Sequence, residues 1–173
     1  MPRLFFALWP DQAVRNEIRA ITERFPRAHG RLVPAQNVHI TLAFLGQVED
    51  QVCKALRTGA ATIHTGPFDL TLEQLGWWKR SRILWLGTHS VPAELEQLVR
   101  ALKSMLKSLG LGHSIDDRDF VPHVTLMRDV RKPDLSQPVT PIYWKVDRFV
   151  LVESVTEPSG PTYRLVDQWK LPG

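Results

Sequence analysis

The hydrophobic residues of this chain recur with two different periods, and segments of the two kinds follow one another along the sequence. Short apolar runs and alternation at every second position predict strands, whereas apolar residues spaced three or four apart predict helices that bury one face. After the candidate cap Asp11, for example, Val14, Ile18 and Ile21 have helical spacing. The expected elements are, in chain order, strand 3–9, helix 11–25, strand 38–45, helix 49–62, strand 68–73, strand 83–86, helix 90–110, strand 121–127 and two long strands, 143–155 and 162–171.

The order of these elements favours one α+β domain. Strands and helices alternate early in the chain, strands dominate its end, and no segment has the composition of an interdomain linker. A chain of 173 residues can bury roughly two-thirds of the surface that its unfolded form exposes, which is enough for one core. We therefore expect residues 1–173 to form a single α+β domain.

Charge and cysteine content indicate the kind of partner and the cellular compartment to expect for the protein. The 22 Lys and Arg against 18 Asp and Glu give a net charge of +4, which suits an anionic partner such as nucleic acid. The only cysteine, Cys53, excludes an intramolecular disulfide and a cysteine-based zinc cluster, and it fits a reducing cytoplasm. The longest apolar run, residues 4–9, is too short to span a bilayer, and no leader opens the chain. We expect a cytoplasmic protein that is not embedded in a membrane.

A tetrapeptide pattern that occurs twice carries the most information about function. Residues 39–42 read His-Ile-Thr-Leu, and residues 123–126, which begin 84 positions later, read His-Val-Thr-Leu. Of the six histidines, only these two have a Ser or Thr two positions further on. Side chains two apart in a strand point to the same face, so each motif histidine stands beside its threonine while the aliphatic residues face a core.

Two imidazoles and two hydroxyls in one cleft are the groups that displacement at phosphorus needs. One neutral imidazole, of His39 or His123, can take a proton from an attacking water while the other, charged, gives one to the departing oxygen, and each transfer accelerates the reaction by roughly 10²- to 10⁴-fold. The hydroxyls of Thr41 and Thr125 can hydrogen-bond the non-bridging phosphate oxygens, where charge gathers in the transition state. A cyclic phosphodiester is a suitable substrate because its strained ring opens without a metal ion.

Other interpretations of these histidines fit the sequence less well. A single strand histidine is more often structural than catalytic, but packing does not require His and Thr at matching positions of two strands. For a metal site, the chain lacks His-Glu-x-x-His and His-x-His patterns, and Asp116, Asp117 and Asp119 fall in a predicted loop before the second motif. A Ser-His-Asp hydrolase is unsupported because no Gly-x-Ser-x-Gly occurs.

With these motifs the sequence resembles the 2H phosphoesterase superfamily, and within it the bacterial and archaeal RNA 2′,3′-cyclic phosphodiesterase family, also called the 2′-5′ RNA ligase family. The resemblance covers nearly the whole chain, with no departure at the four polar motif positions. The segments that carry it are RLFFAL (3–8), VHITLAFLG (38–46), RILWLG (82–87), FVPHVTLMR (120–128) and GPTY (160–163).

The resemblance implies two pseudo-symmetric lobes of antiparallel β-sheet, each flanked by helices, around a central cleft. It implies metal-independent hydrolysis, without a cofactor, of RNA 2′,3′-cyclic phosphate ends to 2′-phosphomonoesters, with tRNA fragments among the substrates. His39 would be the proton donor to the leaving 3′ oxygen and His123 the proton acceptor, although the residues alone leave these roles interchangeable. Reverse joining of RNA ends through a 2′-5′ bond is a secondary expectation, and we expect a monomer.

Further residues are candidates for binding the substrate. Arg128 follows the second motif closely enough to reach a phosphate, but alternation puts it on the face opposite His123 unless the strand ends or bulges there. Segment 77–82, Trp-Trp-Lys-Arg-Ser-Arg, mixes rings that can stack bases with cations that can hold phosphates; we favour phosphate contacts for its basic residues and inward packing for its tryptophans. The substrate-binding candidates are Arg128, Arg118, Trp85, Phe6 and Arg82, with core packing as the alternative for the two aromatic residues.

Two other functions remain open at this stage. The protein could act on a smaller substrate, such as a nucleotide or ADP-ribose cyclic phosphate, and the salt dependence of binding would distinguish this from RNA. It could also be an RNA-binding module without activity, although a pure binder does not need two titratable groups.

Overall fold

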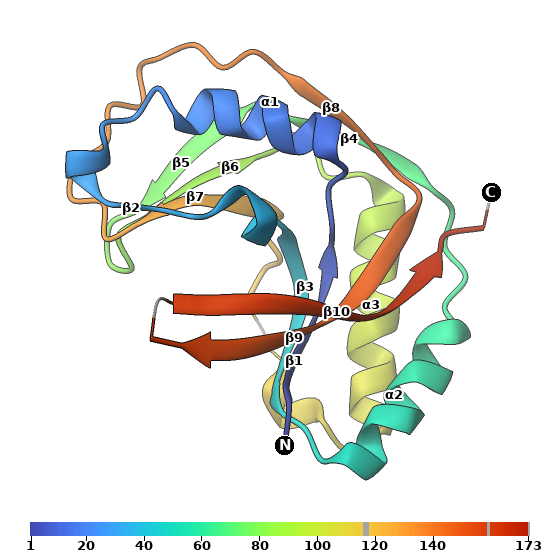
Figure 1. The fold of residues 1–173 in the computed structure, drawn as a ribbon. Helices are drawn as coiled ribbons and strands as arrows, with labels where there is room; N and C mark the ends of the chain where they lie inside the picture. Colours follow the sequence, from blue (N-terminus) through green and yellow to red (C-terminus); the bar gives the residue numbers. More distant parts are fainter. Residues whose placement is uncertain (116–117, 159, 173) are drawn as a thin grey trace.

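Ten strands, three α-helices and three single-turn 3₁₀-helices make up the described part of the chain, residues 1–115, 118–158 and 160–172 of a computed structural model (Figure 1). The strands are β1 (Arg3–Leu8), β2 (Arg31–Leu32), β3 (Ile40–Gln47), β4 (Phe68–Leu72), β5 (Gln74–Trp78), β6 (Ile83–Gly87), β7 (His123–Arg128), β8 (Ile142–Val146), β9 (Arg148–Glu157) and β10 (Gly160–Lys170). The helices are α1 (Gln12–Thr22), α2 (Asp50–Ala61) and α3 (Ala93–Ser108), with the 3₁₀-helices η1 (Arg27–His29), η2 (Ala35–Asn37) and η3 (Gly112–Ser114).

Eight of the strands form one antiparallel sheet in the order β10-β9-β1-β3-β7-β6-β5, with β2 beside β7. The strands β4 and β8 form a separate two-stranded sheet. The pairing between β3 and β7 consists of one residue pair, Ile40 opposite Val124, whereas β1 with β3 and β6 with β7 pair over several residues. The large sheet therefore has two halves that meet at the two motif strands, and the expected α+β class with antiparallel sheets is confirmed.

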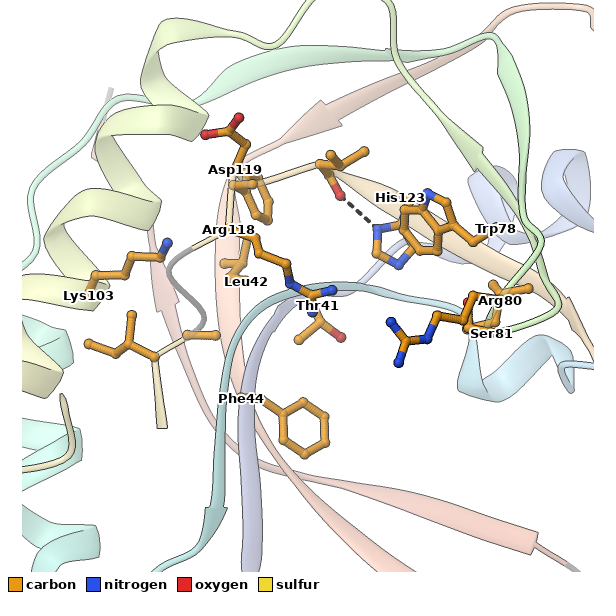
Figure 2. Close-up of a pocket in the computed structure, with 15 residues that line it drawn as sticks. Thr41, Leu42, Phe44, Trp78, Arg80, Ser81, Lys103, Arg118, Asp119 and His123 are labelled. Atoms are coloured by element: carbon orange, nitrogen blue, oxygen red, sulfur yellow. Dashed lines mark hydrogen bonds between the residues drawn. The ribbon is translucent and has the colours of Figure 1, made fainter. Parts of the chain in front are cut away.

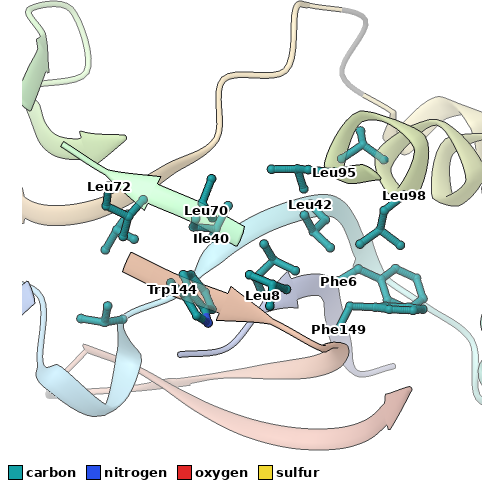
Figure 3. Packing of buried hydrophobic residues seen from close by; sticks show 14 of the residues in the cluster. Phe6, Leu8, Ile40, Leu42, Leu70, Leu72, Leu95, Leu98, Trp144 and Phe149 are labelled. Atoms are coloured by element: carbon teal, nitrogen blue, oxygen red, sulfur yellow. The ribbon is translucent and has the colours of Figure 1, made fainter. Parts of the chain in front are cut away.

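The main hydrophobic core lies on one face of the large sheet. Side chains of β1 and β3 on this face pack towards β4, β8 and helix α3 (Figure 3). Helix α3 buries in this core an apolar stripe that consists of Leu95, Leu98, Val99, Leu102 and Leu106. Phe5 and Ala7 of β1 point the other way and form a small second cluster with Val150 and Val152. Both faces of β1 are therefore covered, which explains its uninterrupted apolar sequence.

Local signals set where the helices begin and end. The Asp11 carboxylate accepts the backbone N–H of Val14 at 2.9 Å and caps α1, as expected. Gly110 follows α3 with φ of +76°, and the N–H of Leu111 donates to the carbonyl of Leu106 at 2.9 Å, which is the Schellman arrangement. None of the described helices is long and apolar enough to cross a membrane.

The expected single strand 143–155 is wrong, because this segment is divided between the two sheets. β8 pairs with β4, whereas β9 pairs with β1 and β10. Asp147 separates the two strands; its carbonyl accepts the N–H of Leu171 at 2.7 Å, and its carboxylate accepts from Arg148 at 2.9 Å. Alternate residues are buried in β8, but four consecutive ones, 149–152, are buried in β9, which lies inside the large sheet. The hydrophobic character common to both strands conceals the break.

Candidate active site

The pairing between β3 and β7 brings the two motifs together. Ile40 and Val124 occupy the same position in their motifs, they pair with each other, and both are fully buried in the core. The neighbouring His and Thr side chains consequently lie on the other face of the sheet. When the antiparallel register is continued by one residue, His39 stands opposite Thr125 and Thr41 opposite His123. The four polar groups of the repeat thus share one face across the junction of the two half-sheets.

Both motifs contain a β-bulge immediately after the threonine. In β3, Leu42 has no partner, because the residues on either side of it pair with consecutive residues of β1. In β7, Leu126 has no partner for the same reason, since its neighbours pair with consecutive residues of β6. An extra residue in one strand resets the alternation of side chains beyond it. Residues after each bulge therefore exchange faces relative to an uninterrupted strand.

The bulge in β7 turns Arg128 to the face of the motif histidines. Leu126 and Met127, although consecutive, are both buried, and Arg128 is exposed. The charge of Arg128 lowers the pKa of both His39 and His123, so the guanidinium lies within electrostatic reach of both rings. The bulge is the exception to side-chain alternation that the sequence analysis named for Arg128. Arg128 therefore lies on the same face of the sheet as the two motif histidines.

Both imidazole rings are held by a backbone carbonyl two residues earlier in the chain. Nδ1 of His39 lies 2.6 Å from the carbonyl oxygen of Asn37, and Nδ1 of His123 lies 2.7 Å from that of Val121. A carbonyl only accepts hydrogen bonds, so Nδ1 carries the hydrogen in each ring and Nε2 is the nitrogen that gains or loses a proton. Nε2 of His39 lies 3.1 Å from the hydroxyl oxygen of Thr41, which can donate to it.

Aromatic rings enclose His39 on several sides. The centroid of its ring lies 4.9 Å from that of Phe5 and 5.2 Å from that of Tyr163, and Trp9 stacks on it at 5.6 Å with an interplanar angle of 15°. The guanidinium of Arg15 lies over the ring of Trp9, 5.0 Å from its centroid. These contacts fix the orientation of the imidazole and keep it largely out of water.

The electrostatic environment disfavours a charge on either histidine. Burial lowers the pKa of His39 from 6.5 to about 4, the positive charges of Arg128, His123 and Arg15 act in the same direction, and the hydrogen bond to Asn37 opposes them. Burial is also the main cause that lowers the pKa of His123. Near neutral pH, and without a bound anion, both rings are therefore neutral.

The lowered pKa of His39 makes the stability of the fold depend on pH. Between pH 6.5 and about 4 the unfolded chain binds a proton that the folded chain does not, so the free energy of unfolding falls as the pH is lowered through this interval. The loss expected from this group is about 3 kcal/mol. Between pH 7.5 and pH 4.5, the free energy of unfolding measured in urea should fall less for His39→Asn than for the wild type. For His64→Asn, at an exposed histidine, it should fall as much as for the wild type. Equal drops in all three proteins would contradict this assignment.

A cavity of about 1120 Å³ opens beside His123 (Figure 2). The ring of Trp78 borders it and lies edge-to-face to that of His123, with centroids 4.5 Å apart. The other residues that line it come from β3, the β5–β6 turn, the start of β6, α3 and the loop before β7, and they are Thr41, Leu42, Ala43, Phe44, Arg80, Ser81, Ile83, Lys103, Ile115, Arg118, Asp119, Phe120 and Val121. The candidate Arg118 therefore faces this space.

Three other candidates, Phe6, Trp85 and Arg82, do not line this cavity. Phe6 as a cleft residue is wrong: it is fully buried in the main core against Phe149 and Trp169, because β1 turns its even-numbered side chains from the site. Trp85 is 8% exposed, and its ring contacts that of His123, with centroids 6.3 Å apart.

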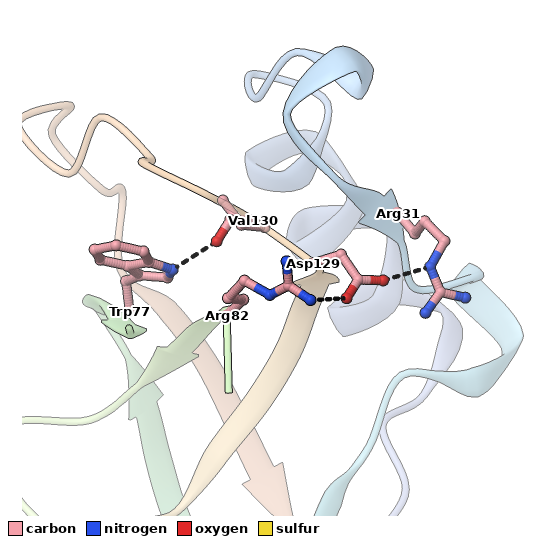
Figure 4. Close-up of polar contacts among 5 residues, drawn as sticks. All are labelled: Arg31, Trp77, Arg82, Asp129 and Val130. Atoms are coloured by element: carbon pink, nitrogen blue, oxygen red, sulfur yellow. Dashed lines mark hydrogen bonds and ion pairs between the residues drawn. The ribbon is translucent and has the colours of Figure 1, made fainter. Parts of the chain in front are cut away.

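Arg82 does not line the cavity but forms an ion pair at the end of β7. Its guanidinium lies 3.5 Å from the carboxylate of Asp129, which also accepts from Arg31 at 2.7 Å (Figure 4). Beside this cluster, Nε1 of Trp77 donates to the carbonyl oxygen of Val130 at 3.1 Å. These contacts hold the β5–β6 turn against the residues that follow Arg128.

Four aromatic residues at the site were not predicted from the sequence. They are Phe5, Trp9, Tyr163 and Trp78, which contact the motif histidines. The sequence favours inward packing for Trp78, and it marks Tyr163 only as part of the segment 160–163 in the family resemblance. Phe5 and Trp9 belong to an apolar run in which no single residue is marked by its neighbours.

Metal-ligand geometry is not found in the described part of the chain. Within residues 1–115, 118–158 and 160–172, no three His, Cys, Asp or Glu side chains are grouped so that they could hold a metal ion. Asp116 and Asp117, in the predicted loop before the second motif, lie outside the described residues.

Comparison with known proteins identifies relatives of this chain by sequence and by structure. Residues 10–157 match the 2′-5′ RNA ligase superfamily. The RNA 2′,3′-cyclic phosphodiesterase of Escherichia coli K12 is 38% identical over 174 residues, which cover 98% of this chain and 96% of that protein. The structure of E. coli LigT in its apo form aligns with a TM-score of 0.89 at 35% identity over 99% of this chain and 98% of that one, and the LigT complex with 3′-AMP aligns with a TM-score of 0.86 at 35% identity over 98% and 97%. The chain belongs to the 2′-5′ RNA ligase superfamily and is homologous to RNA 2′,3′-cyclic phosphodiesterases over nearly its whole length.

Proposed function

We propose that this protein hydrolyses RNA 2′,3′-cyclic phosphate ends to 2′-phosphomonoesters without a metal ion or cofactor. The observation that carries the proposal is the pair of imidazoles on one face of the sheet, each anchored through Nδ1 so that Nε2 is left to exchange a proton. The relatives named as RNA 2′,3′-cyclic phosphodiesterases support the substrate, and the positive net charge suits an RNA chain.

In the proposed reaction the two histidines act at opposite ends of one displacement. Nε2 of His123 accepts a proton from the attacking water as its oxygen bonds to phosphorus. The bond between phosphorus and the 3′ oxygen breaks, and that oxygen receives the proton on Nε2 of His39. His39 is neutral in the free protein, so it must gain its proton when substrate binds. The anionic phosphate supplies the reason, because a negative charge beside an imidazole raises its pKa.

In this proposal three further side chains bind the phosphate itself. The hydroxyls of Thr41 and Thr125 can donate to the non-bridging oxygens, and the guanidinium of Arg128 can neutralise the charge that develops on them. The same groups serve the joining of RNA ends, in which a 5′-hydroxyl takes the place of water as the nucleophile, the bond between phosphorus and the 3′ oxygen breaks, and a 2′-5′ bond forms. Hydrolysis dominates in this proposal because water is always present at the open face of the site.

Incubation with an oligonucleotide that ends in a 2′,3′-cyclic phosphate tests the proposal directly. In excess EDTA we expect complete conversion to a 2′-phosphate, identified chromatographically against 2′- and 3′-phosphate standards. Activity that requires an added divalent cation, or a 3′-phosphate product, would overturn the mechanism. Turnover of nucleotide or ADP-ribose cyclic phosphates alone would assign a small substrate, and tight RNA binding with no product over hours would assign a non-catalytic binding module.

A further inference from the structure

The two histidines have unequal surroundings although their motifs pair symmetrically. Phe5, Trp9 and Tyr163 enclose the ring of His39, with centroids 4.9 to 5.6 Å away. His123 instead borders the cavity of about 1120 Å³. This volume exceeds the roughly 300–1,000 Å³ that sites for single small ligands occupy. The cavity therefore has room for much more than the phosphate on which the histidines act.

The cavity has the charge and surface of a site for an anionic, ring-bearing ligand. Its lining includes three cationic side chains, Arg80, Lys103 and Arg118, and one described carboxylate, Asp119. Arg118 and Arg80 extend into it from opposite walls in front of Thr41 (Figure 2). Cationic side chains favour a phosphate, and guanidinium groups bind phosphate through two parallel hydrogen bonds.

An apolar wall complements these cations. The ring of Phe44 lies at the end of the cavity away from His123 and is 47% exposed, although it is large and hydrophobic. Phe44 occupies the same position after the first motif as Arg128 does after the second, and the bulge at Leu42 determines the face on which it lies. Exposed aromatic rings near cations are the combination with which proteins bind single-stranded RNA.

We propose that this cavity binds the nucleotide on the 5′ side of the one that bears the cyclic phosphate. This inference rests on the proposed function and makes the preferred substrate an oligonucleotide of at least two residues. Arg80 and Arg118 hold the phosphodiester that links the two nucleotides, and the preceding base covers the exposed ring of Phe44. A cyclic mononucleotide reaches the histidines and Arg128 but does not extend to Arg80, Arg118 or Phe44.

The test compares kcat/KM for a dinucleotide 2′,3′-cyclic phosphate and for the nucleoside 2′,3′-cyclic phosphate with the same terminal base, both in EDTA. We expect the wild type to prefer the dinucleotide by at least about tenfold. Arg80→Gln and Arg118→Gln should each lower kcat/KM for the dinucleotide by roughly tenfold and leave the mononucleotide within about twofold of the wild type. Arg100→Gln, on the exposed side of α3 and outside the cavity, removes the same charge and should change neither value.

The outcomes separate this inference from the function on which it rests. Equal kcat/KM for both substrates in the wild type would overturn the inference of a nucleotide site but not the proposed function. Equal losses on both substrates in the two cavity variants would do the same. A loss in Arg100→Gln as large as in the cavity variants would attribute the effect to net charge and would also overturn it. If the wild type turned over neither substrate, the proposed function and this inference would fall together.

Discussion

Replacing His39 or His123 by asparagine is expected to lower kcat/KM for an RNA 2′,3′-cyclic phosphate by at least about 10²-fold in each case. The asparagine amide keeps a donor near the position of Nδ1, so the hydrogen bond to the carbonyl of Asn37 or Val121 can persist. What each variant loses is Nε2, the atom that exchanges the proton. Because both transfers belong to one displacement, the double variant should be only slightly slower than the slower single variant.

An exposed histidine provides the matched control for these two variants. His64→Asn makes the same chemical change outside the site and should retain the wild-type kcat/KM. The free energy of unfolding of each variant, measured in urea at pH 7.5, establishes that a slow variant is folded. Wild-type turnover in EDTA by either motif variant would exclude paired acid and base catalysis by these residues.

The half of the site that the sequence predicts is the half that depends on local strand geometry. Side chains two apart in a strand share a face wherever the strand lies, so the neighbouring positions of His and Thr follow from the motif alone. The aliphatic residues Ile40 and Val124 must face a core, which fixes the polar groups on the other side. Most of the elements up to β7 follow from hydrophobic period for the same reason, but the sequence does not predict the strands β2 and β5.

The rest of the site depends on pairings between distant segments, which leave no local signal. The bulge at Leu126 arises from the register between β6 and β7, and the two consecutive apolar residues in the sequence do not show that the alternation changes there. Phe5 and Phe6 present the same difficulty. They are adjacent, identical and both buried, because β1 is covered on both faces, and only the pairing with β3 decides which of them meets His39. The division of 143–155 between two sheets is likewise set by the partners of each strand.

The second large effect is expected at Arg128, whose place in the site depends on that bulge. Arg128→Ala should lower kcat/KM by about 10²-fold, because removing one group that stabilises charge in the transition state typically costs 10²- to 10³-fold. Arg128→Lys keeps the charge without the planar fork of donors, so an intermediate loss is expected. Since the charge of Arg128 lowers the pKa of both histidines, the acid limb of kcat/KM in Arg128→Ala should also move to higher pH.

Arg131→Gln, at an exposed arginine three residues further along the chain, is the control for loss of a positive charge near the site. It should retain the wild-type rate and pH profile. Because Arg128 is itself exposed, the free energy of unfolding of Arg128→Ala should lie within about 0.5 kcal/mol of the wild-type value. This measurement separates a role at the phosphate from a role in the fold. A normal rate in Arg128→Ala would place its guanidinium outside the reaction, and a slow rate with an unchanged acid limb would mean that it does not act on the histidines electrostatically. The combination of a slow rate and a displaced acid limb is what a guanidinium on the same face as both imidazoles requires.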